Sequence, residues 1–407
     1  MFKVKADGTG FTTVYSFTAA YANDYNTQTN ADGLDPFGGL ILSSNFLYGT
    51  TRHGGSFGAG TVFKVKTDGT GFTNLHNFPP LPAIPRRGIA PSAGLILLGN
   101  TLYGTTSGGG LVGVPESSGN VFALNTDGTG FTNLYDFTDL SCCPDINTDG
   151  ADPRGLIVSG NILYGTTRRG GSFGWGTVFG VNTDGTGFTT LQNFSDGANP
   201  TASLVLADNT LYGTTHSFGY GTVFAVKTNG TGFTNLYNFT GGSDGDSPFA
   251  ELLLSGNSLY GTASAGGSFG HGTVFAVNTD GTGFKNLHSF TSGSGSYPNF
   301  ANSDGANPTT GLILADNTLY GTAPDGGSSA SGTIFSIFIQ PQLAIIPSGQ
   351  SVILTWPTNY GGFTLQSATN LVSPVWTTNS PAPVVVNGQN TVTNPISGTQ
   401  QFYRLSQ

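Results

Sequence analysis

The chain has few charged residues and almost no cysteine. Only 9% of its 407 residues are Asp, Glu, Lys or Arg, against roughly 25% in ordinary globular domains. Its two cysteines, Cys142 and Cys143, are adjacent, which excludes a disulfide framework. We expect two free thiols in a loop, with a strained disulfide between the two neighbours as the alternative.

Basic clusters and long apolar runs are also missing. The net charge of −9 and the lack of a basic stripe argue against a nucleic-acid or anionic-membrane partner. No apolar run approaches the roughly 20 residues of a transmembrane segment. We expect no signal peptide in this sequence, because Met1 leads directly into an expected strand at Phe2–Lys5. On this expectation an export signal was either removed or never present.

Neutral polar residues must form most of the surface, which favours an extracellular or cell-surface location. The 64 Gly and 21 Pro alone would suggest disorder. However, the chain also contains 30 Phe and 15 Tyr, which recur at regular spacing. Regularly spaced aromatic residues indicate a folded tandem-repeat protein instead.

Three short motifs recur along the chain, which makes the repeat the first feature to interpret. Tyr-Gly-Thr begins at residues 48, 103, 164, 212, 260 and 320, and Asp/Asn-Gly-Thr-Gly-Phe begins at 7, 68, 127, 184, 229 and 280. A Val/Ile-Phe pair lies between them in each full copy. Helical periodicity is lacking, and alternating apolar residues such as Phe63 and Val65 predict strands.

Each repeat is interpreted as four short antiparallel strands, as in one blade of a β-propeller. Five complete blades are expected at about 39–78, 94–137, 155–194, 202–239 and 250–290. Gly311–Ile339 supplies the first three strands of another blade, and Met1–Phe17 supplies a third and a fourth. Because ring closure removes exposed sheet edges, we predict an all-β, six-bladed propeller whose N- and C-terminal strands share the last blade.

The motif set resembles a known family. Gly-Leu-Ile-Leu, Leu-Tyr-Gly-Thr-Thr, Gly-Gly-Ser-Phe-Gly, Gly-Thr-Val-Phe and Asp-Gly-Thr-Gly-Phe, in this order, are similar to the Gloeobacter/Verrucomicrobia tandem repeat over residues of about 1–339. The resemblance implies an exported bacterial protein. It carries over no catalytic residues, and no sorting tail is recognisable at the end of the chain, Arg404–Gln407.

Residues 340–407 lack the repeat and are expected to form a second domain. Short strands are predicted there, for example at Val352–Trp356 and Phe363–Gln366. Trp356 and Trp376 are a candidate core pair. The segment is predicted to be a small β-sandwich-like module of the immunoglobulin or fibronectin kind, which serves as a spacer or an adhesion module. A core of this size is marginal on its own.

Ligand binding is expected on the face that carries the longer loops, because variable loops on a rigid scaffold usually carry function. Aromatic and cationic side chains in these loops suit a sugar ring or an acidic group; packing against neighbouring blades is the plainer alternative. The candidate ligand-binding residues are Arg52, His53, Arg168, Arg169, Trp175, His216, Tyr220 and His271. His76 and His288 occupy a position that is Tyr in other repeats, which indicates a structural role.

Two further motifs concern carboxylates. Asp145, Asn147 and Asp149 match half of a calcium-binding loop, so calcium is a candidate ligand, although the motif's final Glu is missing. An Asp-Gly-x-Asp/Asn-Pro motif precedes most blades and commonly shapes a turn; alternatively it lines the mouth of the ring with carboxylates. Its second copy is broken and reads Arg86-Arg87-Gly88, so these two arginines would give the mouth an asymmetric counter-charge.

The sequence contains no catalytic constellation. Ser56, Ser172 and Ser268 match the G-x-S-x-G motif, but that motif needs a strand-to-helix turn and a His partner. We therefore favour a non-catalytic protein that binds a polysaccharide or a surface protein. One alternative is a polysaccharide hydrolase or lyase that uses carboxylates such as Asp35, Asp152 or Asp246. The other is a purely structural surface repeat.

Overall fold

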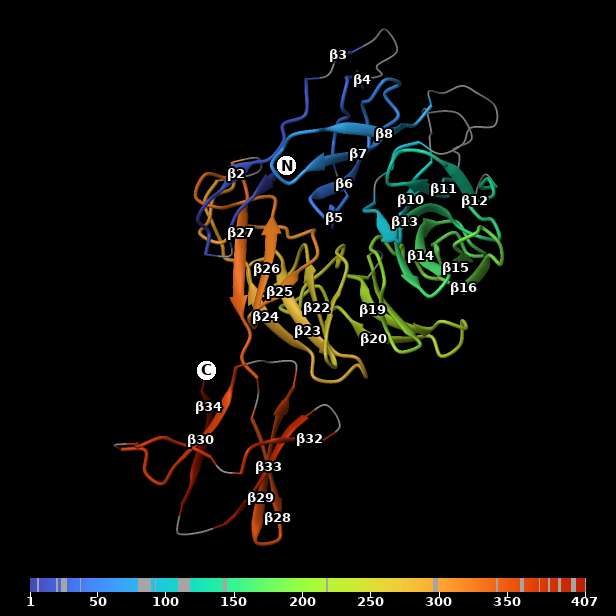
Figure 1. Ribbon diagram of the computed structural model, residues 1–407. Helices are drawn as coiled ribbons and strands as arrows, with labels where there is room; N and C mark the ends of the chain where they lie inside the picture. The colour runs from blue at the N-terminus through green and yellow to red at the C-terminus, as the bar shows by residue number, and fades with distance from the viewer. Residues whose placement is uncertain are drawn as a thin grey trace.

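The protein is built from β-strands. The computed structural model describes residues 1–5, 7–19, 21–22, 28–36, 38–79, 89–91, 93–108, 118–141, 145–216, 219–295, 299–341, 343–358, 362–372, 374–379, 381–386, 389–396 and 400–406. Within these ranges no residue belongs to a helix, so none forms an apolar helix of membrane-spanning length. Figure 1 shows successive sheets arranged around a centre, in chain order, with the C-terminal segment beyond the ring.

Five consecutive sheets each contain four antiparallel strands in meander order. The first comprises β5 (Ile41–Ser43), β6 (Phe46–Thr51), β7 (Thr61–Lys66) and β8 (Thr73–Asn77). The second comprises β9 (Ile96–Leu98), β10 (Thr101–Thr106), β11 (Asn120–Asn125) and β12 (Thr132–Asp136). The third comprises β13 (Ala151–Ser159), β14 (Ile162–Arg169), β15 (Thr177–Asn182) and β16 (Thr189–Asn193). The fourth comprises β17 (Val205–Ala207), β18 (Thr210–Thr215), β19 (Thr222–Lys227) and β20 (Thr234–Asn238). The fifth comprises β21 (Leu253–Ser255), β22 (Ser258–Ala263), β23 (Thr273–Asn278) and β24 (Lys285–Ser289).

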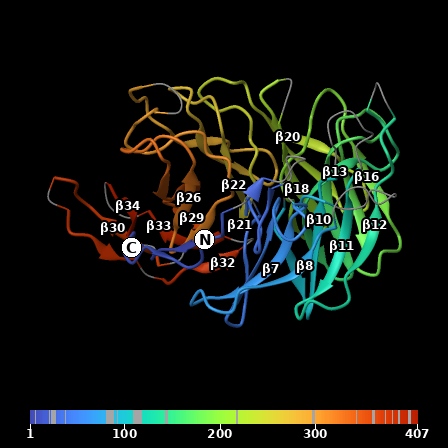
Figure 2. The same cartoon turned by 90° about the horizontal axis from the view of Figure 1, so that it is seen from above.

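Two incomplete sheets stand at the ends of this series. β25 (Ile313–Ala315), β26 (Thr318–Ala323) and β27 (Thr333–Phe338) form a three-stranded sheet, and β1 (Phe2–Lys3) pairs only with β2 (Thr12–Thr13). Figures 1 and 2 place the N-terminal strands on the same side of the ring as β26 and β27. A further hairpin, β3 (Tyr21–Ala22) with β4 (Gln28–Thr29), lies in the segment before β5.

The predicted sharing of one blade by the two chain ends therefore needs correction. Among the described residues, no ladder joins β1 or β2 to β27. The reason lies in the repeat itself, because β1 and β27 both correspond to the third strand of a blade. Two equivalent strands cannot occupy one position, and each stays with its own hairpin partner: β1 with β2, and β27 with β26.

Apolar residues from adjacent sheets pack together between them. In each cluster the Tyr, Val and Phe of one sheet meet the Leu and Phe of the next, as Tyr48, Val62 and Phe78 meet Leu95 and Leu102. Five such clusters connect the six sheets from β5–β8 to β25–β27. A Phe that ends one sheet also contacts the third-strand Phe of the next, with ring centroids 5.0–5.5 Å apart. Packing of this kind is what a single blade lacks.

The junction between the last sheet and the first is packed less completely. Ile334 in β27 is 48% exposed, whereas the Val at this position in the five complete sheets is fully buried. Leu40 is 42% exposed, although its counterparts at the other junctions are buried. The N-terminal strands cover part of the first sheet, because Tyr15 stacks on Phe72 and Phe17 contacts Phe63.

The C-terminal segment forms two small sheets with a core of their own. One contains β28 (Ala344–Ser348), β29 (Ser351–Pro357), β33 (Gln389–Pro395) and β32 (Val384–Val386). The other contains β31 (Thr377–Thr378), β30 (Thr364–Ala368) and β34 (Phe402–Ser406). Trp356 is buried with Leu354, Leu365 and Val392. The expected pairing of Trp356 with Trp376 is not seen, because Trp376 lies against the guanidinium of Arg404, 4.3 Å from the ring centroid.

Candidate functional site

The residue that follows each Tyr-Gly-Thr-Thr/Ala motif lies at the edge of its sheet. It is beside the Asp-Gly-x-Asp/Asn-Pro motif that precedes the same sheet. Backbone bonds fix this position. The N–H of Arg52 donates to the carbonyl of Asp35 at 3.0 Å, and the N–H of His216 donates to that of Asn199 at 3.3 Å. In chain order the position is occupied by Arg52, Ser107, Arg168, His216, Ser264 and Pro324. We call these six residues the mouth positions.

A buried ion pair lies beside the mouth positions in the third sheet. Arg154 Nη2 is 2.8 Å from Asp152 Oδ2, and Arg168 Nη1 is 3.9 Å from the same oxygen. Asp152 and Arg154 are both largely shielded from solvent, while Arg168 is exposed. The other carboxylate oxygen of Asp152 is buried and accepts no hydrogen bond from a described residue.

The pKa shifts of this pair reflect the cost of burying charge. Burial raises the pKa of Asp152, although Arg154, Arg169, Arg168 and Arg52 all act to lower it. Burial likewise lowers the pKa of the Arg154 guanidinium, against the attraction of Asp152. In both groups desolvation outweighs the pairing, as is common for buried ion pairs. Four guanidinium groups thus act on the one buried carboxylate of Asp152.

His216 extends this region toward the fourth and fifth sheets. Burial lowers its pKa, and Arg168 and Arg154 lower it further, whereas Asp246 raises it. The imidazole also lies on the ring of Phe249, with centroids 4.1 Å apart. Four of the predicted ligand-binding residues, Arg52, Arg168, Arg169 and His216, are therefore brought within electrostatic range of one site. We call this region, with Asp152 and Arg154, the arginine cluster.

The other candidate ligand-binding residues lie elsewhere. His53 Nδ1 contacts Asp35 Oδ2 at 2.8 Å in an exposed pair. Trp175 is half-buried against the apolar cluster between the third and fourth sheets, which is the packing alternative for this side chain. Tyr220 is half-exposed and covers Gly241. His271 lies on Phe300, with ring centroids 4.2 Å apart.

In the half calcium loop, the side chains of Asn147 and Asp149 already form hydrogen bonds with other groups of the protein. Asn147 Oδ1 accepts hydrogen bonds from the N–H groups of Gly150 and Gly171 at 2.8 and 2.7 Å, and its amide donates to the carbonyls of Thr138 and Gly150. Asp149 is buried and accepts from Tyr135 Oη at 2.8 Å and from Thr138. Asp145 is exposed. The oxygens expected to bind calcium at Asn147 and Asp149 therefore stabilise the loop itself.

The same arrangement recurs in repeats that lack the calcium motif. Asn30 and Asn302 make the bonds that Asn147 makes. The first Asp of the inter-blade motif accepts from an aromatic side chain in the preceding sheet at 2.8–3.0 Å, in the pairs Tyr15–Asp32, Tyr135–Asp149, Tyr237–Asp244 and His288–Asp304. Sequence reasoning missed this pairing, although the recurrence of both partners signals it.

The residue before the motif's proline has a structural role as well. Asp35, Ala90, Asp152, Asn199, Ser247 and Asn307 all have positive φ angles of 40–59°. Asp and Asn tolerate this conformation better than most residues, which supports the turn interpretation. Among these six, Asp152 alone is paired with a buried arginine. Arg154 lies two residues before the first Leu of its sheet, a position that is Gly, Ala or Thr in the other five repeats. This contrast could have indicated the arginine cluster from the sequence.

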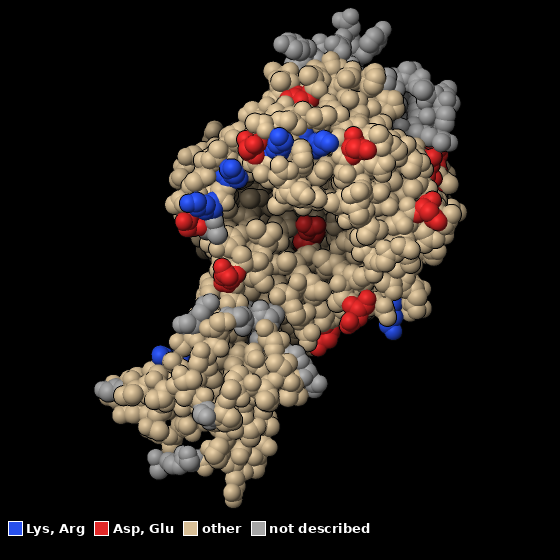
Figure 3. All heavy atoms as spheres, in the orientation of Figure 1, with Lys and Arg blue, Asp and Glu red and all other residues tan. Residues whose placement is uncertain are grey.

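The remaining expectations concern metals, serines and cysteines. The described residues contain no group of three His, Cys, Asp or Glu able to hold a metal ion. The backbone N–H groups of Ser56, Ser172 and Ser268 each donate to a side chain of the fourth strand, in loops that join two strands rather than a strand and a helix. Cys142, Cys143, Arg86 and Arg87 lie outside the described residues. Figure 3 shows charged side chains scattered over the visible face, with an acidic side chain in a hollow near its centre.

The solved structures that match this chain include a lyase and a protein complex. An oligogalacturonate lyase in complex with manganese matches with a TM-score of 0.51 at 9% identity, over 83% of this chain and 82% of that one. At this identity the likeness concerns the fold alone, which is all-β and propeller-like. The nidogen/laminin complex matches with a TM-score of 0.39 at 17% identity, over 63% of this chain and 81% of that one.

Comparison at the level of sequence gives a family. No curated protein sequence matches the chain. The model of the Gloeobacter/Verrucomicrobia repeat matches residues 1–159 and 145–300. These ranges include five of the six Tyr-Gly-Thr motifs and the arginine cluster. The chain belongs to the Gloeobacter/Verrucomicrobia repeat family.

Proposed function

We propose that the protein is an extracellular, non-catalytic binding protein that holds an acidic glycan through the arginine cluster. The observation that carries this proposal is the gathering of four of the chain's seven arginines around one buried carboxylate, in a protein of net charge −9. Such a concentration of positive charge attracts carboxylate groups, which guanidinium binds through paired hydrogen bonds.

The buried and exposed members of the cluster have different roles in this proposal. Arg154 and Asp152 are held together inside the protein and keep the loop edges in place. Arg168 and Arg52 are exposed and direct their charge toward solvent, where a ligand arrives. His216 is largely neutral at physiological pH because its pKa is lowered, so it offers a hydrogen bond rather than a charge.

The arrangement of carboxylates favours binding over hydrolysis. Glycosidases of the common types need two carboxyl groups with separate acid and base roles, about 5–10 Å apart. Asp35 is paired with His53, Asp152 with Arg154, and Asp246 accepts a bond from Ser247 Oγ at 2.7 Å. Each candidate carboxylate thus already has a partner in its own sheet.

Oligogalacturonate is a suitable probe because it is an oligosaccharide with a carboxylate on each ring. Isothermal titration should show that it binds more tightly than a neutral oligosaccharide of equal length, with an affinity that falls as salt is added. The double variant R52Q/R168Q should weaken binding at least tenfold. The matched control K227Q/K285Q also removes two exposed positive charges, in the fourth and fifth sheets, and should bind normally.

Two results would overturn the proposal. Equal binding of the acidic and neutral oligosaccharides would show that the arginines do not recognise the carboxylates of the ligand. Cleavage of oligogalacturonate that is lost in D152N or D246N would replace the binding function with the enzymatic alternative.

We further infer that the sheets from β5–β8 to β25–β27 are the six blades of one ring, and that the C-terminal segment is an immunoglobulin- or fibronectin-like sandwich. The five inter-sheet clusters support the first inference, and two facing sheets around Trp356 support the second. An experimental structure of the full chain would test both. The low content of charged residues supports a location outside the cell, which fractionation of the producing cells would test.

A further inference from the structure

At one junction of the ring, the aromatic stack that connects neighbouring sheets is missing. At four other junctions an aromatic ring in the last strand of one sheet, or in the N-terminal segment, lies flat on the Phe of the next Gly-Thr-Gly-Phe motif. The centroid distances are 3.7–4.3 Å and the interplanar angles 3–10°, in the pairs Tyr15–Phe72, His76–Phe131, Tyr135–Phe188 and Tyr237–Phe284. Between the third and fourth sheets the corresponding residue is Gln192. Among the described residues, the rings that contact Phe233 are those of Phe194, edge-on, and Phe224, tilted, and neither is stacked flat on its face.

The loss of the stack is accompanied by the loss of the buried carboxylate. Asp32, Asp149 and Asp244 are buried and accept bonds from a tyrosine and a threonine. At this junction the linker is shorter, Asp196 follows Phe194 by two residues, and its carboxylate is exposed. Ser195 Oγ donates a hydrogen bond to it at 3.3 Å. Gln192 turns its amide nitrogen to its own neighbour, the carbonyl of Asn193, at 2.9 Å.

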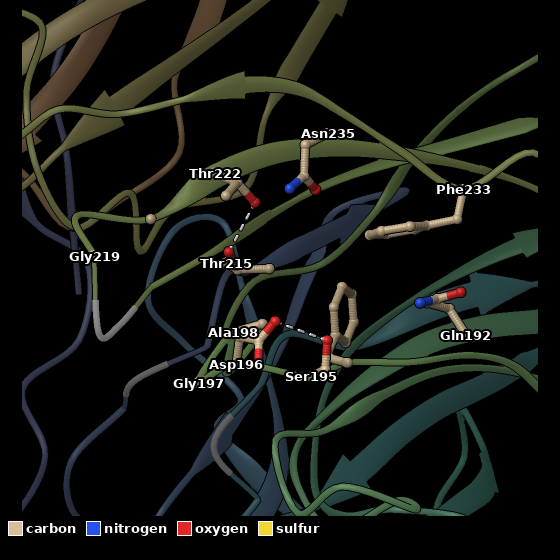
Figure 4. A pocket seen from close by; sticks show the side chains of 12 residues that line it. Gln192, Ser195, Asp196, Gly197, Ala198, Thr215, Gly219, Thr222, Phe233 and Asn235 are labelled. Carbon is tan, nitrogen blue, oxygen red and sulfur yellow. Dashed lines mark hydrogen bonds between the residues drawn. The ribbon is translucent and has the colours of Figure 1, made fainter.

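These changes open a cavity of about 200 Å³ between the third and fourth sheets. Figure 4 shows Phe233, Asn235, Asp196 and Thr215 around this space, with Gln192 beside the ring of Phe233. Phe233 is 37% exposed, whereas Phe131, Phe188 and Phe284 are less exposed beneath their stacked rings. The floor is rigid, because the buried ring of Phe194 packs against Phe233 and Phe224.

The geometry points to a second binding site, for a single neutral sugar ring, in the cavity between Phe233 and Asp196. An uncovered aromatic face takes the apolar face of a pyranose. The carboxylate of Asp196, the amides of Gln192 and Asn235 and the hydroxyls of Thr215 and Thr222 supply the donors and acceptors that sugar hydroxyls require. No basic side chain lines the cavity among the described residues, so the negative charge of Asp196 disfavours an acidic sugar.

The size of the cavity sets the size of the ligand. About 200 Å³ is below the roughly 300–1,000 Å³ of pockets for drug-sized ligands, so the site takes one ring rather than an oligosaccharide. A cationic group would also suit a carboxylate beside an aromatic ring. It would, however, make no use of the remaining hydrogen-bonding capacity of Asn235 and Thr222, which bond to Asn238 and Thr215 but can each form further bonds. This is why the polyhydroxylated ligand is favoured.

Saturation-transfer NMR and titration with methyl glucoside and methyl galactoside test this inference, with methyl glucuronide and methylamine as the acidic and cationic comparisons. Wild-type protein should bind at least one of the neutral glycosides. Q192Y restores the ring that the other junctions carry, fills the space over Phe233 and should weaken binding at least tenfold. H76F, in the equivalent slot of a junction that is already stacked, should bind as the wild type does.

The outcomes separate this inference from the proposed function. R52Q/R168Q should leave the binding of the neutral glycosides unchanged, because it alters a different region. If Q192Y fails to fold, D196N and F233L test the site independently, and each should weaken the binding of the neutral glycosides. The inference is overturned if no neutral glycoside binds, if Q192Y binds as tightly as the wild type, or if methyl glucuronide or methylamine binds more tightly than the neutral glycosides.

Discussion

His76 makes the stability of the propeller depend on pH in a way that can be calculated. Its imidazole stacks on Phe131 at a centroid distance of 3.7 Å and contacts Phe78 edge-on. Its Nε2 atom is buried and has no hydrogen-bond partner among the described residues. Burial lowers its pKa from 6.5 to about 4. The folded state therefore holds the neutral imidazole, whereas the unfolded chain binds a proton below pH 6.5.

The sign and size of the effect follow from linkage. Between pH 6.5 and 4 the unfolded state binds more protons at this site, so the contribution of His76 is complete above pH 6.5 and is lost as the pH falls. The full shift corresponds to about 3 kcal/mol. Solvent still reaches part of the ring, so we expect about half of this value, ~1–1.5 kcal/mol.

The variant His76→Phe keeps the stacked ring and removes the titrating group. Urea unfolding should be measured for both proteins at pH 7.5 and at pH 4.5, under the same conditions. The wild type should lose about 1 kcal/mol more than H76F over this interval. Because the carboxylates titrate equally in both proteins, the difference isolates His76. Equal losses in the two proteins would show that His76 is protonated without cost in the folded state.

Two other predictions concern the loop of the third sheet and the least packed junction. Asn147→Ala removes four hydrogen bonds and should cost about 2–4 kcal/mol in urea unfolding, whereas Asp145→Ala should change stability by less than about 0.5 kcal/mol. Added calcium should leave the melting temperature unchanged. A clear rise would instead support the calcium site that the sequence motif predicts. Val274→Ala in a buried strand should cost about 2–3 kcal/mol. Ile334→Ala, at the equivalent exposed position of β27, should cost under about 1 kcal/mol, and equal costs would show that β27 is covered in solution.

The repeat made most of the fold predictable, because each copy gives the same pattern of strands independently. Four of the five complete sheets lie within the predicted ranges, and the third begins earlier than predicted, at Ala151. The third and fourth strands of each sheet lie where Val-Phe and Gly-Thr-Gly-Phe placed them. The ends were less predictable, since β1 and β27 carry the same third-strand motif. A motif identifies which strand of a blade it forms. It does not identify which of two equivalent strands completes a given sheet.

The candidate site was predictable only in part. Arg52, Arg168 and His216 were selected as loop residues, and the structure brings them to one region. Trp175 was selected on the same grounds but packs between sheets. The difference arises because the exposure of a loop side chain depends on the neighbouring sheet, which lies about fifty residues away in the sequence. Periodicity within one repeat carries no information about that contact.

Departures from the repeat are therefore more informative about function than the repeat itself. Residues that recur, such as the stacked tyrosines and Asn147, are accounted for by hydrogen bonds and packing that every junction needs. Arg154 replaces a small residue and Gln192 replaces an aromatic ring, and each change costs the scaffold something: a buried charge in the first case, a lost stack in the second. Both occur in the third sheet, Arg154 in its first strand, β13, and Gln192 in its fourth strand, β16. That one sheet carries both of these costs is the physical reason to expect ligands at this sheet rather than evenly around the ring.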